Sequence, residues 1–378
     1  MNTIEKLQIL GSAAKYDLCA STSCSRTPSK LTRIGAPSFP GLCHSFLPDG
    51  RCVSLFKVLY SNKCIHDCAY CSNSAMCSKK TATFDTKELS DVFMNFYIRN
   101  YVEGLFLSSG IFRSVESTTD EIISMCEYLR DVRKFQGYIH LKILPGASYD
   151  AISRACRVSD RISLNVELPT KSTFEEVSST KDYKVDILKR LTWIKDITKK
   201  ISPRSGHTTQ FVVGATDETD RELLRMVDWL YKKIDLKRAY FSAFVPIAKT
   251  KLANRPNQNI VREHRLYQFD WLLRMYKISF NELIEVVNDN DFIDLNNDPK
   301  KLLADLNCDL YPLEINDASY NELIRVPGIG IQSAKKIVSL RKNRHKIKKM
   351  IELKHIGVVL KRAAPYIKIN SSYQTTLM

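Results

Sequence analysis

Six short apolar runs recur between residues 54 and 246, and amphipathic helical patterns separate them. The runs are SLFKVLY, GLFLSSG, YIHLKIL, RISLNVEL, TTQFVVG and AYFSAFVP, and their β-branched and aromatic content favours strands. Helical spacing covers 86–100, 118–134, 148–156, 182–200 and 219–232. This alternation predicts a parallel sheet, because parallel strands need crossover connections, which are usually helical. Six repeats fall short of the eight of a full TIM barrel, which leaves a partial (βα)6 TIM-like barrel or an open doubly wound sheet.

The segments on either side of these repeats have different patterns. The first seventeen residues have the spacing of an amphipathic helix, and 19–50 is rich in Ser, Pro and Gly, which indicates loop. Residues 260–306 return to helical spacing, and we expect this region to pack on the barrel. We therefore divide the chain into an N-terminal extension (1–50), an α/β domain (51–250), a helical extension (251–315) and an all-α terminal domain (316–370).

Net charge is distributed unevenly along the chain. The whole sequence carries +16, yet 321–368 holds thirteen Lys or Arg against two acids. Such asymmetry favours a polyanion-binding module, since nonspecific affinity for phosphate backbones is electrostatic. No apolar run approaches the ~20 residues of a transmembrane helix, and the N-terminus lacks a signal-peptide pattern. Eleven cysteines in such a chain favour reduced thiols and metal over disulfides, and we expect a cytoplasmic protein without membrane attachment.

Three of these cysteines lie close together directly after the first predicted strand. Cys64, Cys68 and Cys71 form a CxxxCxxC pattern at the carboxyl end of that strand, where α/β folds place their active sites. A structural zinc site or a fully ligated cluster normally takes four protein ligands. Three thiols therefore suggest a [4Fe–4S] cluster with one iron open to a ligand. A zinc site completed by Cys77 or His66, or buried structural thiols, are the alternatives.

CxxxCxxC with an aromatic residue, Tyr70, directly before its last cysteine resembles the hallmark of radical S-adenosylmethionine enzymes. The resemblance implies that the methionyl group of S-adenosylmethionine chelates the open iron. It also implies that reductive cleavage yields a 5′-deoxyadenosyl radical, which removes a hydrogen atom from the substrate. A small electron carrier such as flavodoxin or ferredoxin would then be a partner.

The same resemblance implies further cofactor contacts. Ser108, Ser109 and Gly110 occupy the place of a GGE-like turn that holds the methionyl amine, although this chain lacks the glutamate. We expect Gly110 to permit close backbone approach. Asn165 and Glu167 are predicted to share one face of the fourth strand and to bond a ribose, with a strand-end capping pair as the alternative. Gly214 would lie against the adenine or mark a plain turn, and Lys142, Tyr240 and Ser242 are substrate candidates by position.

The terminal domain contains LIRVPGIGIQSAKKIV, a predicted helix, tight turn and helix. Glycines in such a turn let backbone N–H groups point at one phosphate, aided by the next helix's N-terminus. The segment resembles the helix-hairpin-helix motif of DNA repair proteins, which contacts nucleic-acid backbone without sequence readout. The implied contact residues are Pro327, Gly328, Gly330, Lys335 and Lys336. A looser second copy surrounds Ile356 and Gly357, and a hairpin that binds protein is the alternative.

The blocks EGLFLSSG, GYIHLKILPGAS, EHRLYQFDWLLR and VPGIG together resemble the DNA modification or repair radical SAM family over nearly the full length. The resemblance implies a partial barrel of the radical SAM type that acts on a nucleotide, with DNA favoured over RNA. The target would be flipped, damaged or single-stranded, because a base inside a duplex is unreachable. The rivals are a radical SAM enzyme acting on RNA and a noncatalytic DNA-binding protein with a structural iron–sulfur centre.

Overall fold

The computed structural model describes residues 1–14, 41–46, 52–201 and 203–369. The chain separates into two compact units. The first holds Met1–Glu218 and Arg225–Ile260, and the second holds Thr219–Leu224 and Val261–Met378. In the part of the chain that is described, no helix is long and apolar enough to cross a membrane.

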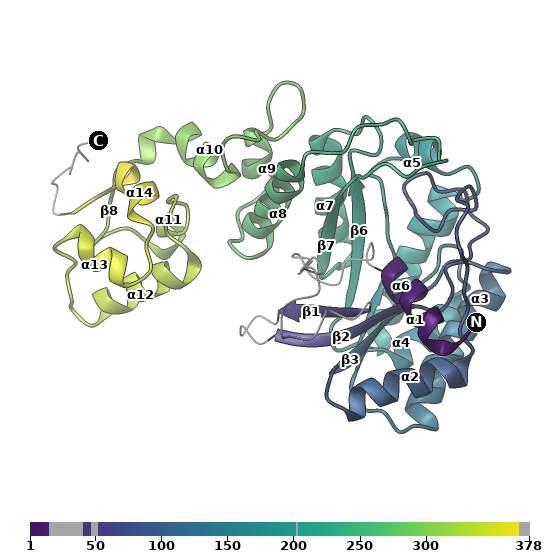
Figure 1. The fold of residues 1–378 in the computed structure, drawn as a ribbon. Helices are drawn as coiled ribbons and strands as arrows, with labels where there is room; N and C mark the ends of the chain where they lie inside the picture. Colours follow the sequence, from purple (N-terminus) through teal and green to yellow (C-terminus); the bar gives the residue numbers. More distant parts are fainter. Residues whose placement is uncertain (15–40, 47–51, 202, 370–378) are drawn as a thin grey trace, which may run out of the picture. The chain divides into compact units, whose positions relative to one another are not determined.

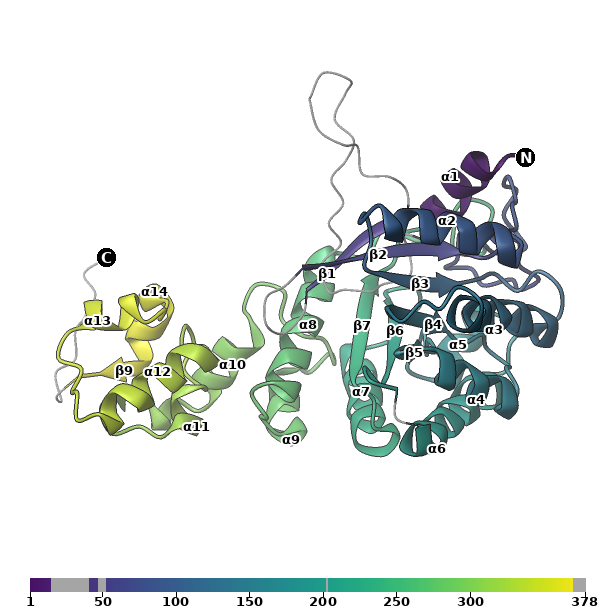
Figure 2. The same cartoon turned by 90° about the horizontal axis from the view of Figure 1, so that it is seen from below.

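A curled seven-stranded sheet forms the centre of the first unit (Figures 1 and 2). Six parallel strands follow each other in chain order: β2 (Cys52–Leu59), β3 (Gly104–Ser108), β4 (Tyr138–Lys142), β5 (Arg161–Ser163), β6 (His207–Val213) and β7 (Arg238–Ala243). A doubly wound sheet would reverse its strand order at a switch point, and this sheet does not. The predicted partial (βα)6 barrel is confirmed.

The crossover helices lie on the convex side of the sheet (Figure 2). They are α2 (Thr86–Ile98), α3 (Val115–Asp131), α4 (Tyr149–Val158), α5 (Lys171–Val177), the π-helical turn Tyr183–Lys189 with α6 (Arg190–Ile201), and α7 (Asp220–Ile234). Asp85 and Ser114 each accept a hydrogen bond from a backbone N–H of the first turn of α2 and α3, as N-cap residues do. The helical patterns in the sequence are therefore confirmed, apart from the short α5, which they missed.

The two faces of the sheet differ in polarity. The convex face is apolar and fully buried under the helices at Phe56, Val58, Leu105, Leu107, Ile139, Leu141, Ile162, Phe211, Val213 and Phe241. Alternate residues point to the concave face. There, Lys57, Phe106, His140 and Arg161 lie side by side in one row, and Lys142, Ser163, Thr208 and Arg238 in the next. The core lies between the sheet and the helices. The concave face carries the charged side chains of the strands, together with Phe106.

Two features of this unit differ from the sequence prediction. Strand β1 (Leu42–Phe46) pairs antiparallel with β2 inside a region expected to be loop. Strand β5 ends at Ser163, so Asn165 and Glu167 do not lie on it as predicted, and Glu167 has a left-handed φ of 67°. The apolar run continues past the strand because Leu164, Val166 and Leu168 are fully buried without forming a ladder. The N-terminal helix, α1 (Thr3–Ala13), is as expected.

The second unit is helical and closed by a small two-stranded sheet. It contains α8 (Ile260–Arg274), α9 (Phe280–Leu283), a 3₁₀ turn (Ile284–Val286), α10 (Pro299–Leu306), a 3₁₀ turn (Cys308–Leu310), α11 (Tyr320–Leu323), α12 (Ile331–Lys342), α13 (Met350–His355), α14 (Leu360–Ala363) and a last 3₁₀ turn (Ala364–Tyr366). Strands β8 (Leu313–Glu314) and β9 (Ile367–Lys368) pair in parallel and join the two ends of the hairpin region. Residues 261–315 belong to the same compact unit as the terminal hairpins, and the expected packing of 260–306 on the barrel stays a prediction.

Candidate functional sites

One cavity at the carboxyl end of the parallel strands collects most of the predicted cofactor residues. Its volume is about 120 Å³, and it opens to solvent. Cys64, Cys68 and Cys71 line it, and so do eight other residues named from the sequence: His66, Tyr70, Ser108, Ser109, Gly110, Lys142, Asn165 and Glu167. These residues come from four separate stretches of the chain. The fold therefore brings them together where the sequence could place them only one strand at a time.

The loop that carries the cysteines is held against the sheet by backbone contacts. Ile65 N donates to Ile111 O at 2.8 Å, and Ala69 N donates to Val177 O at 2.8 Å. Gly110 permits the close approach that we expected, but its partner is this loop. A Cβ at Gly110 would lie 2.4 Å from Lys63 O, a separation that real Cβ atoms essentially never show. Gly110 is thus required for the position of Cys64, whether or not a cofactor contacts it.

The carboxylate of Asp67, which the sequence pattern does not mark, holds the same loop in place through hydrogen bonds. Asp67 accepts hydrogen bonds from the hydroxyls of Ser178, Ser179 and Thr180 at 3.1, 2.5 and 2.9 Å, and from Ser179 N at 3.1 Å. Burial raises the pKa of Asp67, but these donors outweigh it and hold the pKa well below its ordinary value. Only the tertiary structure reveals this pairing, because 111 residues separate Asp67 from Ser178.

The cavity is electrostatically unusual around the thiols. Burial, followed by the charge of Cys68, raises the pKa of the Cys71 thiol to about 12. Burial by itself would lower the pKa of Lys181, but the neighbouring Cys68 and Glu167 raise it overall. Lys181 therefore supplies a positive charge beside the cysteines. Deprotonating three thiols in this space requires compensating positive charge, which Lys181 and a bound metal centre together can provide.

Two buried polar atoms in the cavity lack a hydrogen-bond partner among the described residues. They are Tyr70 Oη and His66 Nε2. Burial lowers the pKa of His66 to about 4, helped by Lys181, so its imidazole is neutral near pH 7. Its other ring nitrogen lies 2.9 Å from Thr180 Oγ1. Buried polar groups normally find partners, so these two atoms are consistent with a cavity built around a polar ligand.

The donor set fits an iron–sulfur cluster held by three cysteines. Within the described residues, no three His, Cys, Asp or Glu side chains gather closely enough to hold a single metal ion, so the zinc alternative gains no support. A [4Fe–4S] cluster sets a different requirement, because each thiolate binds a separate iron. Cys77 is not among the lining residues, and its Sγ lies 3.9 Å from Ala248 O. The other free cysteines with described side chains include Cys126 and Cys156, which are buried in helices, and Cys308, which is exposed.

The remaining cysteines only partly follow expectation. Cys43 is disulfide-bonded, which corrects the prediction of reduced thiols throughout the chain. Cys19 and Cys24 lie outside the described residues, as does the side chain of Cys52.

Gly214 is not among the residues that line this cavity. Its φ is +84°, and a Cβ there would lie 2.1 Å from Gln258 Oε1. Its backbone N donates to Glu218 Oε1 at 2.5 Å, and its O accepts from Arg255 Nε at 2.9 Å. The protein itself therefore uses both backbone groups of Gly214, and the predicted adenine contact remains a prediction.

The terminal hairpin folds around a compact apolar core. Leu323, Ile324, Val326, Ile329, Ala334 and Ile337 are all buried in it, as the sequence predicted, and Val338 packs against it. The second hairpin contributes Leu353, Val358 and Ala363 to the same core. The two copies are thus one folding unit, and the looser repeat is structurally integral.

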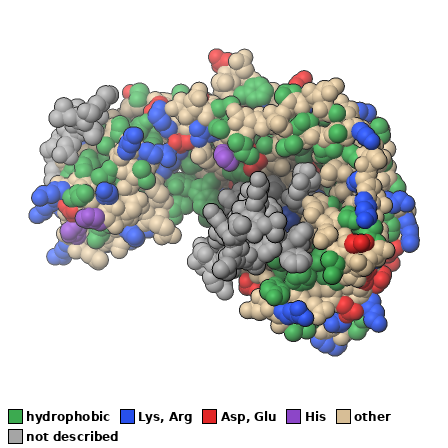
Figure 3. Space-filling model, viewed as in Figure 1, with side chains coloured by type: hydrophobic (Ala, Val, Ile, Leu, Met, Phe, Trp, Pro, Cys, Tyr) green, Lys and Arg blue, Asp and Glu red, His purple; other side chains and the backbone are tan. Residues whose placement is uncertain are grey.

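The turn residues divide into two groups. Pro327 is buried, and Gly328 has φ +85° with its Cβ direction blocked by Val359 O at 2.5 Å. Gly328 O accepts from Val359 N at 2.9 Å, so this glycine joins the two hairpins. A Cβ at Gly330, the N-cap of α12, would meet nothing closer than Tyr276 Oη at 3.8 Å. Lys335 and Lys336 are exposed and form no ion pair with any described residue, and Lys and Arg gather on this module (Figure 3).

Three cations connect the hairpin region to the helices before it. Lys300 Nζ donates to Ile329 O at 2.6 Å and lies 4.8 Å from the Tyr276 ring centroid. Burial, followed by the charge of Arg362, lowers the pKa of Lys300 to about 7. Arg325 forms a two-pronged ion pair with Glu282, and Arg362 pairs with Asp298. Sequence reasoning missed these residues because their partners lie 29 to 64 positions away.

Comparisons with known proteins give a family match for the terminal hairpins and distant structural likenesses for more of the chain. Residues 312–363 match the family model described as a helix-hairpin-helix motif. No curated protein matches the chain. A crystal structure of HydG, a maturase of the [FeFe]-hydrogenase, is 12% identical over 79% of both chains, with a TM-score of 0.47. Methylornithine synthase, PylB, is 12% identical over 55% of this chain and 60% of its own, with a TM-score of 0.43. These likenesses are too distant to carry an argument about activity.

Proposed function

We propose that this protein is a radical S-adenosylmethionine enzyme that modifies or repairs DNA. The observation that carries the proposal is the convergence of three cysteines, Tyr70, Ser108–Gly110, Asn165 and Glu167 on one cavity at the carboxyl end of a parallel sheet. Active sites of α/β folds lie at this edge. The proposed cofactors are a [4Fe–4S] cluster and S-adenosylmethionine, which when bound supply a 5′-deoxyadenosyl radical for hydrogen-atom removal.

The chain's own groups have separate tasks in this proposal. Cys64, Cys68 and Cys71 hold the cluster, and Lys181 offsets their negative charge. Ser108, Ser109, Asn165 and Glu167 line the cavity, where their polar groups would bind the polar parts of S-adenosylmethionine. The buried apolar residues beneath the cavity, among them Leu59 and Ile143, exclude water from one side. Electrons would come from flavodoxin or ferredoxin.

The terminal hairpin is the part of the chain that would bind DNA. The exposed N-terminus of α12 and the unpaired Lys335 and Lys336 offer a phosphate-binding end and two cations next to it. The excess of positive charge in 321–368 adds nonspecific affinity for any nucleic-acid backbone. A helix-hairpin-helix motif favours DNA, and RNA is the second candidate.

The test is anaerobic reconstitution of the full chain with iron and sulfide, reduction, and addition of S-adenosylmethionine with or without DNA. We expect 5′-deoxyadenosine to form and its rate to rise with DNA. A rate that rises with RNA and not with DNA would move the substrate to RNA. A stable cluster whose spectrum ignores S-adenosylmethionine, with no product, would replace the enzyme by a DNA-binding protein with a structural cluster.

A further inference from the structure

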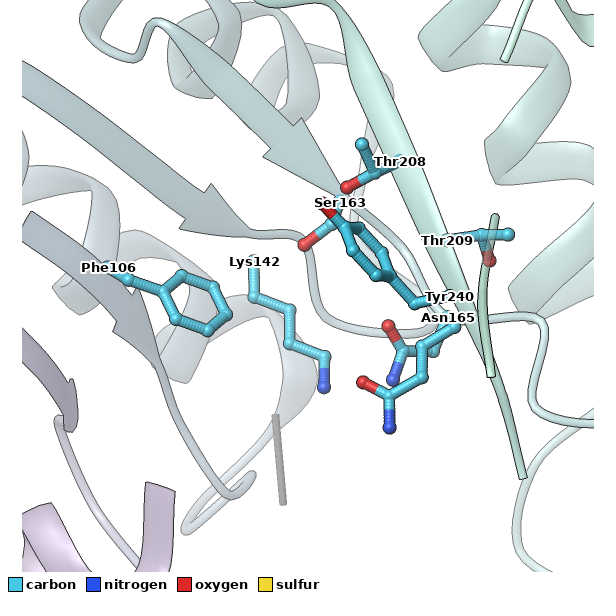
Figure 4. Close-up of a pocket in the computed structure, with 8 residues that line it drawn as sticks. Phe106, Lys142, Ser163, Asn165, Thr208, Thr209 and Tyr240 are labelled. Atoms are coloured by element: carbon cyan, nitrogen blue, oxygen red, sulfur yellow. The ribbon is translucent and has the colours of Figure 1, made fainter. Parts of the chain in front are cut away.

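Cations gather on two surfaces of the described chain, and the two surfaces differ in how open they are. On the concave face of the sheet, other side chains enclose the cations, and Figure 4 shows Lys142 between Phe106 and Tyr240. The pocket there has a volume of about 10 Å³, which is roughly the space of one water molecule. In the hairpin region most of the cations are exposed to solvent. The hairpin region is therefore the surface that a macromolecule can reach.

The cations of the hairpin region divide into two groups. The stretch 323–351 contains no acidic residue. Two of its cations serve the fold, since Arg325 pairs with Glu282 at 2.8 Å and Arg341 donates to two backbone carbonyls. The other seven are exposed and form no ion pair with any described residue: Lys335, Lys336, Lys342, Arg344, Lys346, Lys348 and Lys349. Blocks of like charge of this kind are typical of surfaces that bind nucleic acid.

Helix α12 carries the first three of these cations on one polar stripe. Its exposed side chains recur at helical spacing: Gln332, Lys335, Lys336, Ser339 and Lys342. The opposite face of α12 packs into the core through Ala334 and Ile337. Lys335 and Lys342 are seven residues apart, which is two turns and about 10 Å along the helix. The stripe therefore leads from the hairpin turn to the loop that follows α12.

This loop, residues 343–349, is fixed in place, so its charges have defined positions. The backbone of Ile347, a buried core residue, forms two hydrogen bonds with the Asn316 side chain, each of 2.9 Å. The carboxylate of Glu352 accepts from Lys348 N at 3.1 Å and from Lys349 N at 2.9 Å. A surface that is already held in one arrangement loses less conformational entropy on binding than a flexible basic tail does.

Two simpler explanations account for only part of this pattern. The helix macrodipole favours cations in the last turn of α12, which explains Lys342 but not Lys335 and Lys336 near the start. A surface that is merely solvated needs charge of both signs, because neighbouring like charges repel each other. The phosphates of a nucleic-acid strand would remove this repulsion, since each one supplies a negative charge.

We propose that the backbone of the bound DNA continues past the hairpin turn, along the exposed stripe of α12, to the loop 343–349. This inference rests on the proposed function, because it concerns the DNA partner named there. The turn with Lys335 and Lys336 accounts for about two phosphate contacts, and the stripe and loop raise the number to about five to seven. The surface complements DNA in charge, and Gln332 and Ser339 add neutral donors along the same path.

The experiment is fluorescence anisotropy of the reconstituted full chain with labelled single-stranded and duplex DNA at several salt concentrations. The triple variant Lys342→Gln, Arg344→Gln and Lys346→Gln should reduce the slope of log K against log salt by about 2 to 3. Its affinity at low salt should fall about 10- to 100-fold.

Two further variants serve as controls. The first replaces Lys199, Lys200 and Lys233 by Gln, which removes the same charge from exposed positions at the ends of α6 and α7 in the first unit. It should change the slope by less than about 1. The second combines Lys342→Arg, Arg344→Lys and Lys346→Arg, which keeps the charge and should keep the wild-type slope.

Each outcome decides for or against the extended surface. A wild-type slope in the first triple variant would overturn it. An equal reduction in the first control would also overturn it, because net charge would then be the cause, and so would a reduction in the charge-retaining variant. Weaker RNA binding with unchanged DNA binding would exclude DNA as the occupant.

The same measurement separates this inference from the proposed function. A wild-type chain that binds neither form of DNA would overturn both. Intact DNA binding without formation of 5′-deoxyadenosine would count against the proposed function alone, because the salt dependence of binding needs no radical reaction.

Discussion

The cysteine cavity and the terminal hairpin both contain sequence motifs, but the two motifs relate to their sites in opposite ways. Around the cavity, residues that lie far apart in the chain converge on one space, and most of the predicted residues line it. In the hairpin, residues adjacent in sequence divide between the core and the surface. Pro327 and Gly328 serve packing, and Gly330, Lys335 and Lys336 face outward. In the cavity, most of the predicted residues line the site itself. In the hairpin, part of the motif only builds the fold that presents the exposed residues.

The largest expected effect tests whether the cavity motif is purely functional. Cys64→Ala, Cys68→Ala or Cys71→Ala should each abolish the iron–sulfur absorbance and 5′-deoxyadenosine formation, because each removes one ligand of a three-ligand centre. Cys77→Ala is the matched control, since Cys77 is the next cysteine in the chain and does not line the cavity. Retained absorbance in all three variants, or its loss in the control alone, would contradict the assigned ligands.

The second test separates packing from binding within one turn. Gly328→Ala forces a Cβ into Val359 O at a left-handed φ, so it should lower the free energy of unfolding by about 1–3 kcal/mol. Gly330→Ala meets only Tyr276 Oη, at an ordinary contact distance of 3.8 Å and a φ of −90°, and should change stability by less than about 0.5 kcal/mol. Chemical denaturation of the full chain measures both. An equal loss of unfolding free energy in the two variants would contradict the separate roles of Gly328 in packing and Gly330 in binding.

The third test addresses the exposed half of the hairpin. Lys335→Gln and Lys336→Gln should each weaken DNA binding uniformly across sequences and reduce the slope of log K against log salt by about 1. Fluorescence anisotropy at several salt concentrations gives both quantities. Lys301→Gln provides the comparison, because Lys301 lies in the same unit but is already paired with Asp305 at 2.8 Å. If all three variants give the same slope as wild type, DNA does not contact α12 through these lysines.

The smallest expected effect concerns the support of the cysteine loop. Asp67→Asn should lower the stability of the metal-free chain by about 1 kcal/mol at pH 7, after allowance for the solvent exposure of its hydrogen bonds. Because the folded-state pKa of Asp67 is depressed, its contribution is complete above the unfolded value near 3.8 and is lost progressively as pH falls toward the folded-state pKa. The stability gap between the two proteins, measured by denaturation, should therefore be smaller at pH 3 than at pH 7. A gap that stays constant with pH would assign the loss to something other than the carboxylate charge.

Local pattern determined much of this protein. The alternation of apolar runs and helical spacing was sufficient for six parallel strands, although their order came from the structure, and CxxxCxxC identified the loop at their carboxyl edge. Periodicity is a local property, so it survives in any context that buries the apolar face. The pattern failed at Asn165 and Glu167, because the apolar run continues past Ser163, where β5 ends. It also failed at β1, which pairs with β2 although it lies in a stretch rich in Ser, Pro and Gly.

Only the tertiary structure decided what surrounds each motif. It set Asp67 against Ser178–Thr180, brought Lys181 beside Cys68, and placed Lys300 under the hairpin turn. It also gathered Lys142, Arg161 and Arg238 on one concave face, although each stands alone on its own strand. Single charges on separate strands carry no signal in sequence, because their meaning depends on strand order and register. Once order and register are known, alternation along each strand puts these charges on one side of the sheet.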